Sequence, residues 1–238
     1  MIEETVIDPA TYDSWYCTPR GRWIGMREAA LLLEGLQPRA GESLLDVGCG
    51  TGWFTRALGG ATGGRVVGAD VDPEAVRFAR GRDASGASYE VADARALPHA
   101  DASFDLVVSV AALCFITEEA AAAREIVRVA RRRFAVGLLH RPSLLWLDKG
   151  RHGGSGGYRG ARWHTAREAR RLFHDAGARR LRVRTAIHLP GGGTVARAVE
   201  RLGPRWLPTG GFLLVCGEPP GLPPGGRAGE GEAPGGQE

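Results

Sequence analysis

The residues best suited to bind a ligand lie in the glycine-rich stretch Leu44–Gly52. Asp46 stands near the end of an apolar run. Gly48, Gly50 and Gly52 follow it at alternate positions. Glycine allows positive φ and lets a ligand lie directly against the backbone. We expect a helix to begin at the end of this stretch, and the free N–H groups of its first turn attract a carboxylate or a phosphate. The pattern predicts a ligand-binding turn between a strand and a helix.

The charge of Asp46 distinguishes between the ligands that use such turns. Dinucleotide-binding turns carry the spacing G-x-G-x-x-G, whereas the spacing here is G-x-G-x-G. A carboxylate repels a nearby pyrophosphate and attracts an ammonium group. A ligand that carries an amino acid satisfies both ends of the turn, with its ammonium near Asp46 and its carboxylate near the turn amides. S-adenosylmethionine is such a ligand, and a purely structural glycine turn is the alternative.

Two further aspartates end the next two predicted strands. Asp70 stands 24 residues after Asp46, where an acidic side chain can accept hydrogen bonds from both ribose hydroxyls. Asp93 ends the third strand, from which it can accept a hydrogen bond from an adenine amino group; a solvated loop aspartate is the alternative. Asp72 lies in the turn after Asp70, and we expect it to cap the next helix.

Alternating strands and helices position these aspartates. Apolar runs predict seven strands, at 43–47, 65–70, 88–93, 104–110, 134–140, 180–189 and 211–217. Helical patterns occupy 26–36, 52–59, 73–82, 118–131 and 165–176. Pro73 fits the first turn of its helix, and Thr165 and Gly177 suit the start and end of theirs. The alternation implies an α/β fold, a mostly parallel sheet with helices on both faces.

The chain divides into three parts. Residues 1–25 are aromatic and irregular and form an N-terminal arm, which we expect to act as a lid. Residues 26–217 form the α/β domain, in which the glycine-rich insertion 141–164 follows the fifth strand. Residues 218–238 contain too few apolar side chains to offset the entropy of ordering, so we expect them to be disordered.

Composition excludes several classes of protein. The 238 residues, 43% hydrophobic and 24% charged, suit one globular domain. The sequence contains no apolar run of about 18 residues, so it predicts no membrane span. The N-terminus lacks the basic flank and apolar core of a signal peptide. We therefore expect a cytoplasmic protein. The four cysteines have no spacing typical of disulfides or metal ligands, and we expect Cys114 to be a core thiol.

With these residues in place, the chain resembles the class I methyltransferases of the ubiquinone/menaquinone-methyltransferase-like (type 11) group. The resemblance covers residues 10–217 and rests on LLDVGCGTG, VVGADVDPEAVRFAR and EVADARALPHADASFDLVVS, in that order. It implies a Rossmann-like, seven-stranded sheet whose last strand is antiparallel, with S-adenosylmethionine as the cofactor. The resemblance assigns cofactor contacts to these positions: Asp46, Gly48, Cys49, Gly50 and Gly52 for the methionyl part, Asp70 for the ribose, and Val71, Asp93 and Ala94 for the adenine.

The acceptor site is expected over the carboxyl ends of the strands, where ligands bind in open sheets. Candidates to cover or bind the acceptor are large or charged residues of the arm and the insertion: Tyr12, Trp15, Arg20, Trp146 and Trp163. Ordinary packing of the arm and a partly disordered insertion are the alternatives. His140, which closes the fifth strand, is a candidate for a general base, with a structural histidine as the alternative; Tyr12 is a second candidate for a catalytic role.

Together these observations predict methyl transfer from S-adenosylmethionine to a small, partly apolar molecule. In-line displacement requires the acceptor close to the methyl carbon and water excluded. The alternatives are a non-catalytic S-adenosylmethionine-binding protein of the same fold and a nucleotide-dependent oxidoreductase. A nucleic-acid acceptor is not supported, because Ser109–Ala112 lacks the Asn/Asp-Pro-Pro-aromatic motif of base-modifying enzymes. The net charge of +4 comes from dispersed arginines, with Lys149 the only lysine.

Overall fold

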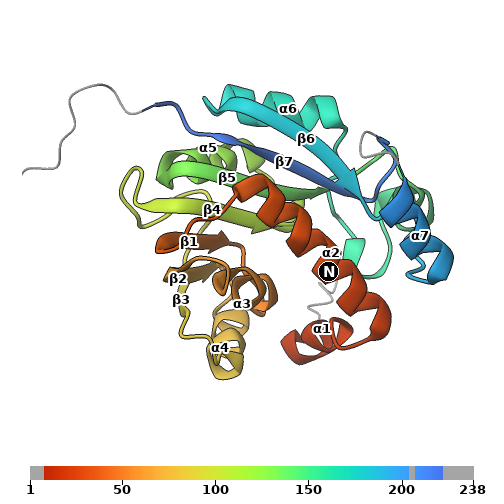
Figure 1. Cartoon of the computed structure of the whole chain (residues 1–238), viewed down its shortest axis with the longest axis horizontal. Coiled ribbons are helices and arrows are strands. Elements are labelled where there is room, and N and C mark those ends of the chain that lie inside the picture. Colours follow the sequence, from red (N-terminus) through yellow and green to blue (C-terminus); the bar gives the residue numbers. More distant parts are fainter. Residues whose placement is uncertain (1–7, 204–206, 222–238) are drawn as a thin grey trace, which may run out of the picture.

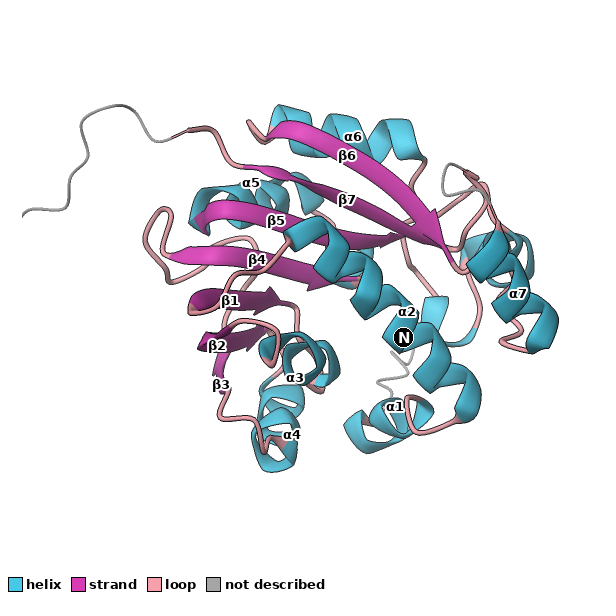
Figure 2. Cartoon of the chain, viewed as in Figure 1, coloured by secondary structure: helices cyan, strands magenta, loops and turns pink. Residues whose placement is uncertain are grey.

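A seven-stranded sheet forms the centre of the computed structural model, which describes residues 8–203 and 207–221. The strands are β1 (Glu42–Val47), β2 (Gly63–Asp70), β3 (Ser88–Val91), β4 (Phe104–Val110), β5 (Ala130–Leu139), β6 (Arg179–Ala186) and β7 (Phe212–Glu218). Their order in the sheet is β3-β2-β1-β4-β5-β7-β6 (Figure 2). Strands β1 to β5 run parallel, and β7 runs antiparallel to β5 and β6. The predicted Rossmann-like sheet with an antiparallel last strand is confirmed.

Helices cover both faces of this sheet (Figure 1). The α-helices of the described residues are α1 (Pro9–Trp15), α2 (Pro19–Leu36), α3 (Trp53–Gly59), α4 (Pro73–Arg82), α5 (Glu119–Val129), α6 (Ala166–Asp175) and α7 (Thr194–Leu202). Leu32 of α2 and Leu58 of α3 join an apolar core on one face. Ile126 of α5 and Phe173 of α6 join the core on the other. The central strands β1, β4, β5 and β7 are covered on both faces and bury most of their side chains, which explains their apolar runs. No helix in the two described ranges is long and apolar enough to cross a membrane.

Local capping sets the ends of the helices that flank the sheet. Pro73 occupies the first turn of α4, and the Asp72 carboxylate accepts a hydrogen bond from the backbone N–H of Glu74 at 2.8 Å. Thr165 and Glu168 form a reciprocal capping box at the start of α6. Gly177 follows that helix with φ of +87°, a conformation that favours glycine. These starts and this stop are confirmed as predicted.

The part of the N-terminal arm that the structure describes is helical, so the prediction of an irregular arm is wrong. Asp8 is the N-cap of α1 and Pro9 its first residue. Thr18 and Pro19 play the same roles in α2, which therefore begins seven residues before the predicted start at 26. A capping side chain followed by proline supplies both an acceptor for a free N–H and a favourable φ. In both places this pattern begins a helix.

The region between α5 and β5 also differs from the prediction. The helix was expected to reach residue 131 and the strand to begin at 134, but α5 ends at Val129 and β5 begins at Ala130. Three consecutive arginines obscured this start. Arg131 pairs with Asp105 at 2.8 Å and Arg132 pairs with Glu42, so their charges are matched at the edge of the core.

Two predictions near the C-terminus need correction or fall outside the structure. The helix α7, between β6 and β7, was not predicted; it begins after Gly193 without a side-chain cap. Glu218 belongs to β7, so the predicted disordered tail 218–238 begins too early. The rest of that predicted segment, from residue 222 onward, lies outside the described residues, as do residues 1–7 of the arm.

Replacing Thr165 with alanine should lower the free energy of unfolding by about 1 kcal/mol, because a helix N-cap contributes roughly that amount. Urea denaturation followed by circular dichroism measures the change. The matched control is Ser155→Ala at an exposed position whose side chain caps no helix; we expect a change below about 0.5 kcal/mol there. Equal losses in the two variants would contradict the capping role of Thr165.

Candidate functional site

A cavity of about 490 Å³ lies at the carboxyl ends of β1, β2 and β4. This volume is within the range of about 300–1,000 Å³ that is typical of small-molecule sites. Eight of the nine predicted cofactor-binding residues line it: Asp46, Gly48, Cys49, Gly50, Asp70, Val71, Asp93 and Ala94. The topology brings these residues together because the parallel strands all end at the same edge of the sheet.

The glycine turn between β1 and α3 forms one wall of this cavity. Gly48 has φ of +71°, and a Cβ atom there would lie 2.2 Å from the Cβ of Ala112. Gly50 has φ of +52° and lines the cavity. Gly52, the ninth predicted residue, does not line it: with φ of +75°, it packs so closely on Tyr89 that a Cβ would come within 2.8 Å of that ring. Gly52 thus contributes to the turn through its contact with Tyr89 and does not face the cavity.

Asp46 is a buried carboxylate at the floor of the cavity. Its side chain is 1% exposed, and the hydroxyl of Thr55 donates a hydrogen bond to it at 2.7 Å. Among the described residues it has no ion-pair partner. Burial raises the pKa of Asp46 to about 7, the hydrogen bond from Thr55 opposes this shift, and the charge of Asp70 adds to it. A positive group bound beside Asp46 would relieve the cost of burying its charge.

Asp70 holds the turn and still faces the cavity. One of its carboxylate oxygens accepts the backbone N–H of Gly50 at 2.6 Å, and the other accepts that of Asp72 at 3.0 Å. Each carboxylate oxygen can accept a second hydrogen bond. Asp70 therefore fixes the approach of β2 to the glycine turn and keeps free acceptor capacity toward a ligand. Asp72 is not in the cavity wall, and its capping of α4 is confirmed.

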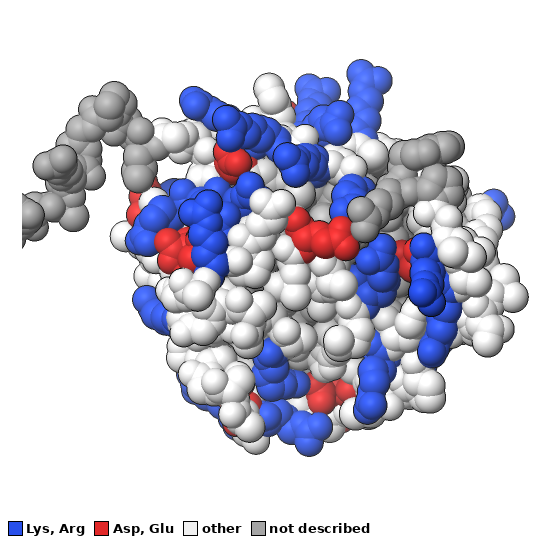
Figure 3. All heavy atoms as spheres, viewed as in Figure 1, with Lys and Arg blue, Asp and Glu red and all other residues white. Residues whose placement is uncertain are grey.

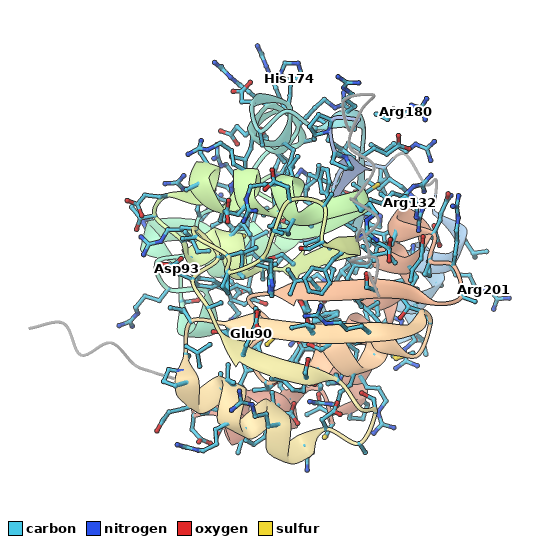
Figure 4. All side chains as sticks on the ribbon, turned by 90° about the vertical axis from the view of Figure 1, so that its left-hand side faces the viewer. Glu90, Asp93, Arg132, His174, Arg180 and Arg201 are labelled. Carbon is cyan, nitrogen blue, oxygen red and sulfur yellow. The ribbon has the colours of Figure 1, made fainter. Side chains whose placement is uncertain are left out.

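Asp93 follows β3 at the side of the cavity and is labelled with Glu90 of that strand in Figure 4. It forms an ion pair with Arg95 at 2.7 Å, and Arg95 also pairs with Glu118. The hydrogen bonds from Arg95 lower the pKa of Asp93. Asp93 is thus held as a carboxylate by a neighbouring cation, in contrast to Asp46.

An aromatic wall that sequence reasoning did not assign to the site closes the cavity. Tyr16 stacks on Trp53 with ring centroids 4.5 Å apart, and Phe54 meets Trp53 edge to face at 4.8 Å. All three rings line the cavity, together with the predicted Tyr12. The hydroxyls of Tyr12 and Tyr16 are 3.4 Å apart. The aromatic content of the arm was the available signal, but which ring faces inward depends on how α1 packs.

The segment after β4 forms the opposite wall and was also missed. Ala111 has φ of +59°, which turns the chain at the end of the strand so that Ala111, Ala112 and Phe115 line the cavity. Phe115 is 52% exposed. No residue type in this segment predicts the turn, because the positive φ of Ala111 is set by tertiary packing. Its neighbour Cys114 is a core thiol, as predicted, at 2% exposure.

The candidate acceptor residues of the arm other than Tyr12 lie outside the cavity wall. Trp15 packs edge to face on Tyr16 with ring centroids 4.9 Å apart. The side chain of Arg20 lies against Gly192. Both residues pack against other parts of the protein and do not enter the cavity.

The candidates from the fifth strand and the insertion lie outside the wall as well. His140 is 1% exposed, and its Nδ1 is 2.8 Å from the carbonyl oxygen of Gly210; burial lowers its pKa. Trp146 lies under the guanidinium of Arg151, and Trp163 is 5% exposed. The position of His140 fits the structural alternative that the sequence left open.

The substitution Asp46→Asn should stabilise the protein in the absence of ligand, increasingly so as the pH rises. An unfolded aspartate titrates near pH 4, whereas burial raises the folded pKa to about 7. Between these two pKa values the unfolded state binds fewer protons than the folded state, so the stability of the wild-type protein falls as pH rises. Relative to wild type, the gain should grow from pH 5 to pH 8 and reach about 4 kcal/mol at most. Urea denaturation at both pH values measures it.

Asp105→Asn is the matched control for this substitution. Although burial opposes it, hydrogen bonds from Ser43 and the charge of Arg131 lower the pKa of Asp105. Stability from this group is present above its unfolded pKa and is lost as pH falls through its folded pKa. The control variant should therefore lose stability at pH 8. A loss in Asp46→Asn as well would show that the Asp46 charge is already compensated within the protein.

Comparison with known proteins finds a family match for the part of the chain that forms much of the cavity wall. Residues 45–133 match a family model described as a methyltransferase domain. An uncharacterized protein of Mycobacterium tuberculosis is 35% identical over 191 residues, 78% of this chain and 63% of the relative. The malonyl-[acyl-carrier protein] O-methyltransferase of Hahella chejuensis is 32% identical over 164 residues, 62% of this chain and 59% of the relative. The chain spans about three fifths of the length of these curated relatives.

A solved structure shares the fold. The S-adenosylmethionine-dependent methyltransferase of Thermotoga maritima, described as a possible histamine N-methyltransferase, aligns with a TM-score of 0.68. The alignment covers 88% of this chain and 94% of that one at 21% identity. Residues 45–133 are therefore similar to methyltransferase domains, and the sheet that carries the cavity has the fold of this solved structure.

Proposed function

We propose that this protein transfers a methyl group from S-adenosylmethionine to a small, partly apolar acceptor. The observation that carries the proposal is Asp46, a buried carboxylate in the cavity floor without a cationic partner among the described residues. Only a ligand with a positive group beside it compensates this charge. The amino-acid part of S-adenosylmethionine carries such a group.

The other residues of the cavity fit the rest of the cofactor. The cofactor carboxylate would lie at the glycine turn near Gly48 and Gly50, whose missing side chains leave the backbone open. Asp70 would accept the ribose hydroxyls with the acceptor capacity left after its two backbone contacts. Val71, 67% exposed, and Ala94 offer apolar surface for the adenine. Asp93 would accept a hydrogen bond from the adenine amino group in competition with Arg95, whose backbone N–H and guanidinium donate to both of its carboxylate oxygens.

When bound, the cofactor supplies an activated methyl group on a positively charged sulfur. The protein has to hold the acceptor in line with that methyl group and exclude water. Tyr12, Tyr16 and Trp53 form an apolar wall suited to both tasks. The arm and the insertion 141–164 are proposed to cover the acceptor, with Tyr12 as the contact between arm and cavity.

Two alternatives from the sequence are weighed against this proposal. A nucleotide-dependent oxidoreductase is disfavoured because Asp46 would repel a pyrophosphate at the glycine turn. A non-catalytic S-adenosylmethionine-binding protein has the same requirements for the cofactor, so only turnover separates it from an enzyme. The finer assignments, to the ubiquinone/menaquinone-methyltransferase-like group and to the cytoplasm, stay predictions.

A small-molecule acceptor is favoured over nucleic acid by the distribution of charge. On the face shown in Figure 3, arginine side chains are interspersed with acidic and uncharged surface. Several are neutralised in ion pairs, such as Arg184 with Glu34 at 2.6 Å and Arg27 with Glu200 at 2.8 Å. A nucleic-acid footprint would instead be a continuous basic stripe.

Replacing Asp70 with alanine should weaken S-adenosylmethionine binding at least about 100-fold, because it removes two charge-assisted hydrogen bonds to the ribose, each contributing about 1.5–3 kcal/mol. Isothermal titration calorimetry measures the affinity. The control Asp72→Ala removes only the cap of α4 and should leave affinity within about twofold while lowering stability by about 1 kcal/mol. Unchanged affinity in the Asp70 variant would overturn the assignment of this strand end.

Incubation with S-adenosylmethionine and a deproteinised pool of cellular small molecules should yield S-adenosylhomocysteine, detected by mass spectrometry. Without the pool, or with the Asp70→Ala variant, the product should stay at background. Cofactor binding without product from any pool would favour the non-catalytic alternative. Fluorescence enhancement of added NADH, with no binding of S-adenosylmethionine, would favour the oxidoreductase.

A further inference from the structure

A charged side chain, rather than an apolar one, is buried where the helix α1 meets the rest of the protein. Within this helix only Asp13 is buried, at 4% exposure, whereas Tyr12 and Trp15 are 46% and 36% exposed. Surface helices ordinarily bury an apolar face. A helix of seven residues is also too short to be stable by itself in water. The position of α1 therefore depends on the contacts of Asp13.

The Asp13 carboxylate lies between two arginines that come from different helices. Arg56 of α3 is 3.2 Å from one carboxylate oxygen, and Arg82 at the end of α4 is 3.4 Å from the other. The helix α1 lies beside both of these helices (Figure 1). Two cations compensate the cost of burying one carboxylate, so these ion pairs account for a buried charge in this short helix.

Arg56 also connects the arm to the glycine turn. A second nitrogen of its guanidinium donates a hydrogen bond to the carbonyl oxygen of Thr51 at 2.8 Å. Thr51 belongs to the turn between β1 and α3 and lines the cavity. The same guanidinium lies against Gly52, where a Cβ would come within 2.9 Å of it. One side chain therefore contacts both the arm and the turn that is proposed to bind the cofactor carboxylate.

An aromatic contact lies next to this charged contact. Tyr16 stands three residues after Asp13 and stacks on Trp53. Trp53 in turn stands three residues before Arg56 in α3. Residues three apart are neighbours on a helix surface, so the arm meets α3 along one side. Tyr12 directly precedes Asp13, and both tyrosines line the cavity. The contacts of Asp13 thus determine where the two tyrosines meet the cavity.

We propose that Asp13 is the positioning residue of the arm, a role that rests on the proposed binding of S-adenosylmethionine in the cavity. The ion pairs of Asp13 hold Tyr12 and Tyr16 over the bound cofactor. The hydrogen bond from Arg56 to Thr51 couples the docked arm to the glycine turn. Because coupling between two sites is reciprocal, the cofactor stabilises the docked arm as much as the docked arm stabilises the bound cofactor.

Ion pairs suit an arm that undocks and docks again. When the arm leaves, the carboxylate of Asp13 and both guanidinium groups regain hydration, which offsets part of the lost attraction. An apolar contact would instead expose hydrophobic surface at every opening. In many enzymes the opening of such a cover limits product release. We therefore expect the dissociation of the cofactor to depend on the ion pairs of Asp13.

Cofactor dissociation tests this role without knowledge of the acceptor. Surface plasmon resonance on immobilised protein gives separate association and dissociation rates for S-adenosylmethionine. The Asp13→Asn variant should release the cofactor at least about 10-fold faster than wild type, in the range of ordinary coupling between sites. Its association rate should stay within about threefold, because a weakened closed state acts mainly on dissociation.

The matched control for this substitution is Asp105→Asn. Asp105 is paired with Arg131 near the start of β4, whereas the cavity lies at the other end of that strand. The control variant should lose stability and keep both rates within about twofold of wild type, as expected for distant, independent sites. Thermal denaturation verifies that each variant is folded.

Two further variants separate the contacts of the ion-pair cluster. Arg82→Gln removes one ion pair of Asp13 and leaves the glycine turn untouched, so it should speed dissociation only about threefold. Arg56→Gln removes an ion pair and also the hydrogen bond to Thr51. Its effect on dissociation should exceed that of Arg82→Gln by at least about threefold, because a hydrogen bond from a charged donor is lost as well.

A protease gives a second readout, of the arm itself. Chymotrypsin cleaves after aromatic residues, and α1 contains Tyr12 and Trp15. Bound S-adenosylmethionine should slow cleavage within the arm at least about fivefold in the wild type, because the ligand stabilises the docked state. In the Asp13→Asn variant the protection should disappear.

Unchanged dissociation in a folded Asp13→Asn protein would overturn the positioning role, as would an equal acceleration in Asp105→Asn. Equal effects of Arg56→Gln and Arg82→Gln would contradict the coupling through Thr51. Failure of the wild-type protein to bind S-adenosylmethionine would contradict the proposed function itself. The two failures are therefore distinguishable in the same set of measurements.

Discussion

Asp46 lies buried at the end of β1, held by the hydroxyl of Thr55 in α3 and close enough to Asp70 for their charges to repel. Taking a carboxylate out of water costs several kcal/mol unless a positive group accompanies it. No residue in the described chain supplies that group, so the charge of Asp46 is not compensated in the unliganded site. The cavity above Asp46 and the glycine turn beside it are arranged so that a positively charged ligand group can compensate this charge.

The glycine turn also joins three strands that are distant in sequence. The backbone N–H groups of Gly48 and Cys49 donate to the carbonyl of Ala69 at 2.7 and 3.0 Å, which ties β1 to β2. The contact between Gly48 and Ala112 brings in the segment after β4. Any side chain at Gly48 would collide with Ala112. The absence of a side chain there therefore allows both the turn and the close approach of the opposite wall.

The cavity wall draws on residues both inside and outside the family match at residues 45–133. Tyr12 of α1 and Tyr16, directly after that helix, lie outside the match, whereas the glycine turn, Trp53 and Ala111 lie within it. The family match therefore covers the residues proposed to bind the cofactor, and the arm adds its two tyrosines to the wall from outside the match.

The sequence by itself determined the parallel strands and the positions of Asp46, Asp70 and Asp93, because apolar runs, caps and the motif around Asp46 are local signals. The antiparallel last strand and the cavity positions of Cys49, Val71 and Ala94 came from the family resemblance. The sequence did not determine the helical arm, the turn at Ala111 or the inward position of Tyr16. Which ring of the arm meets Trp53 depends on packing between segments distant along the chain. Such contacts have no local pattern, so only the tertiary structure decided them.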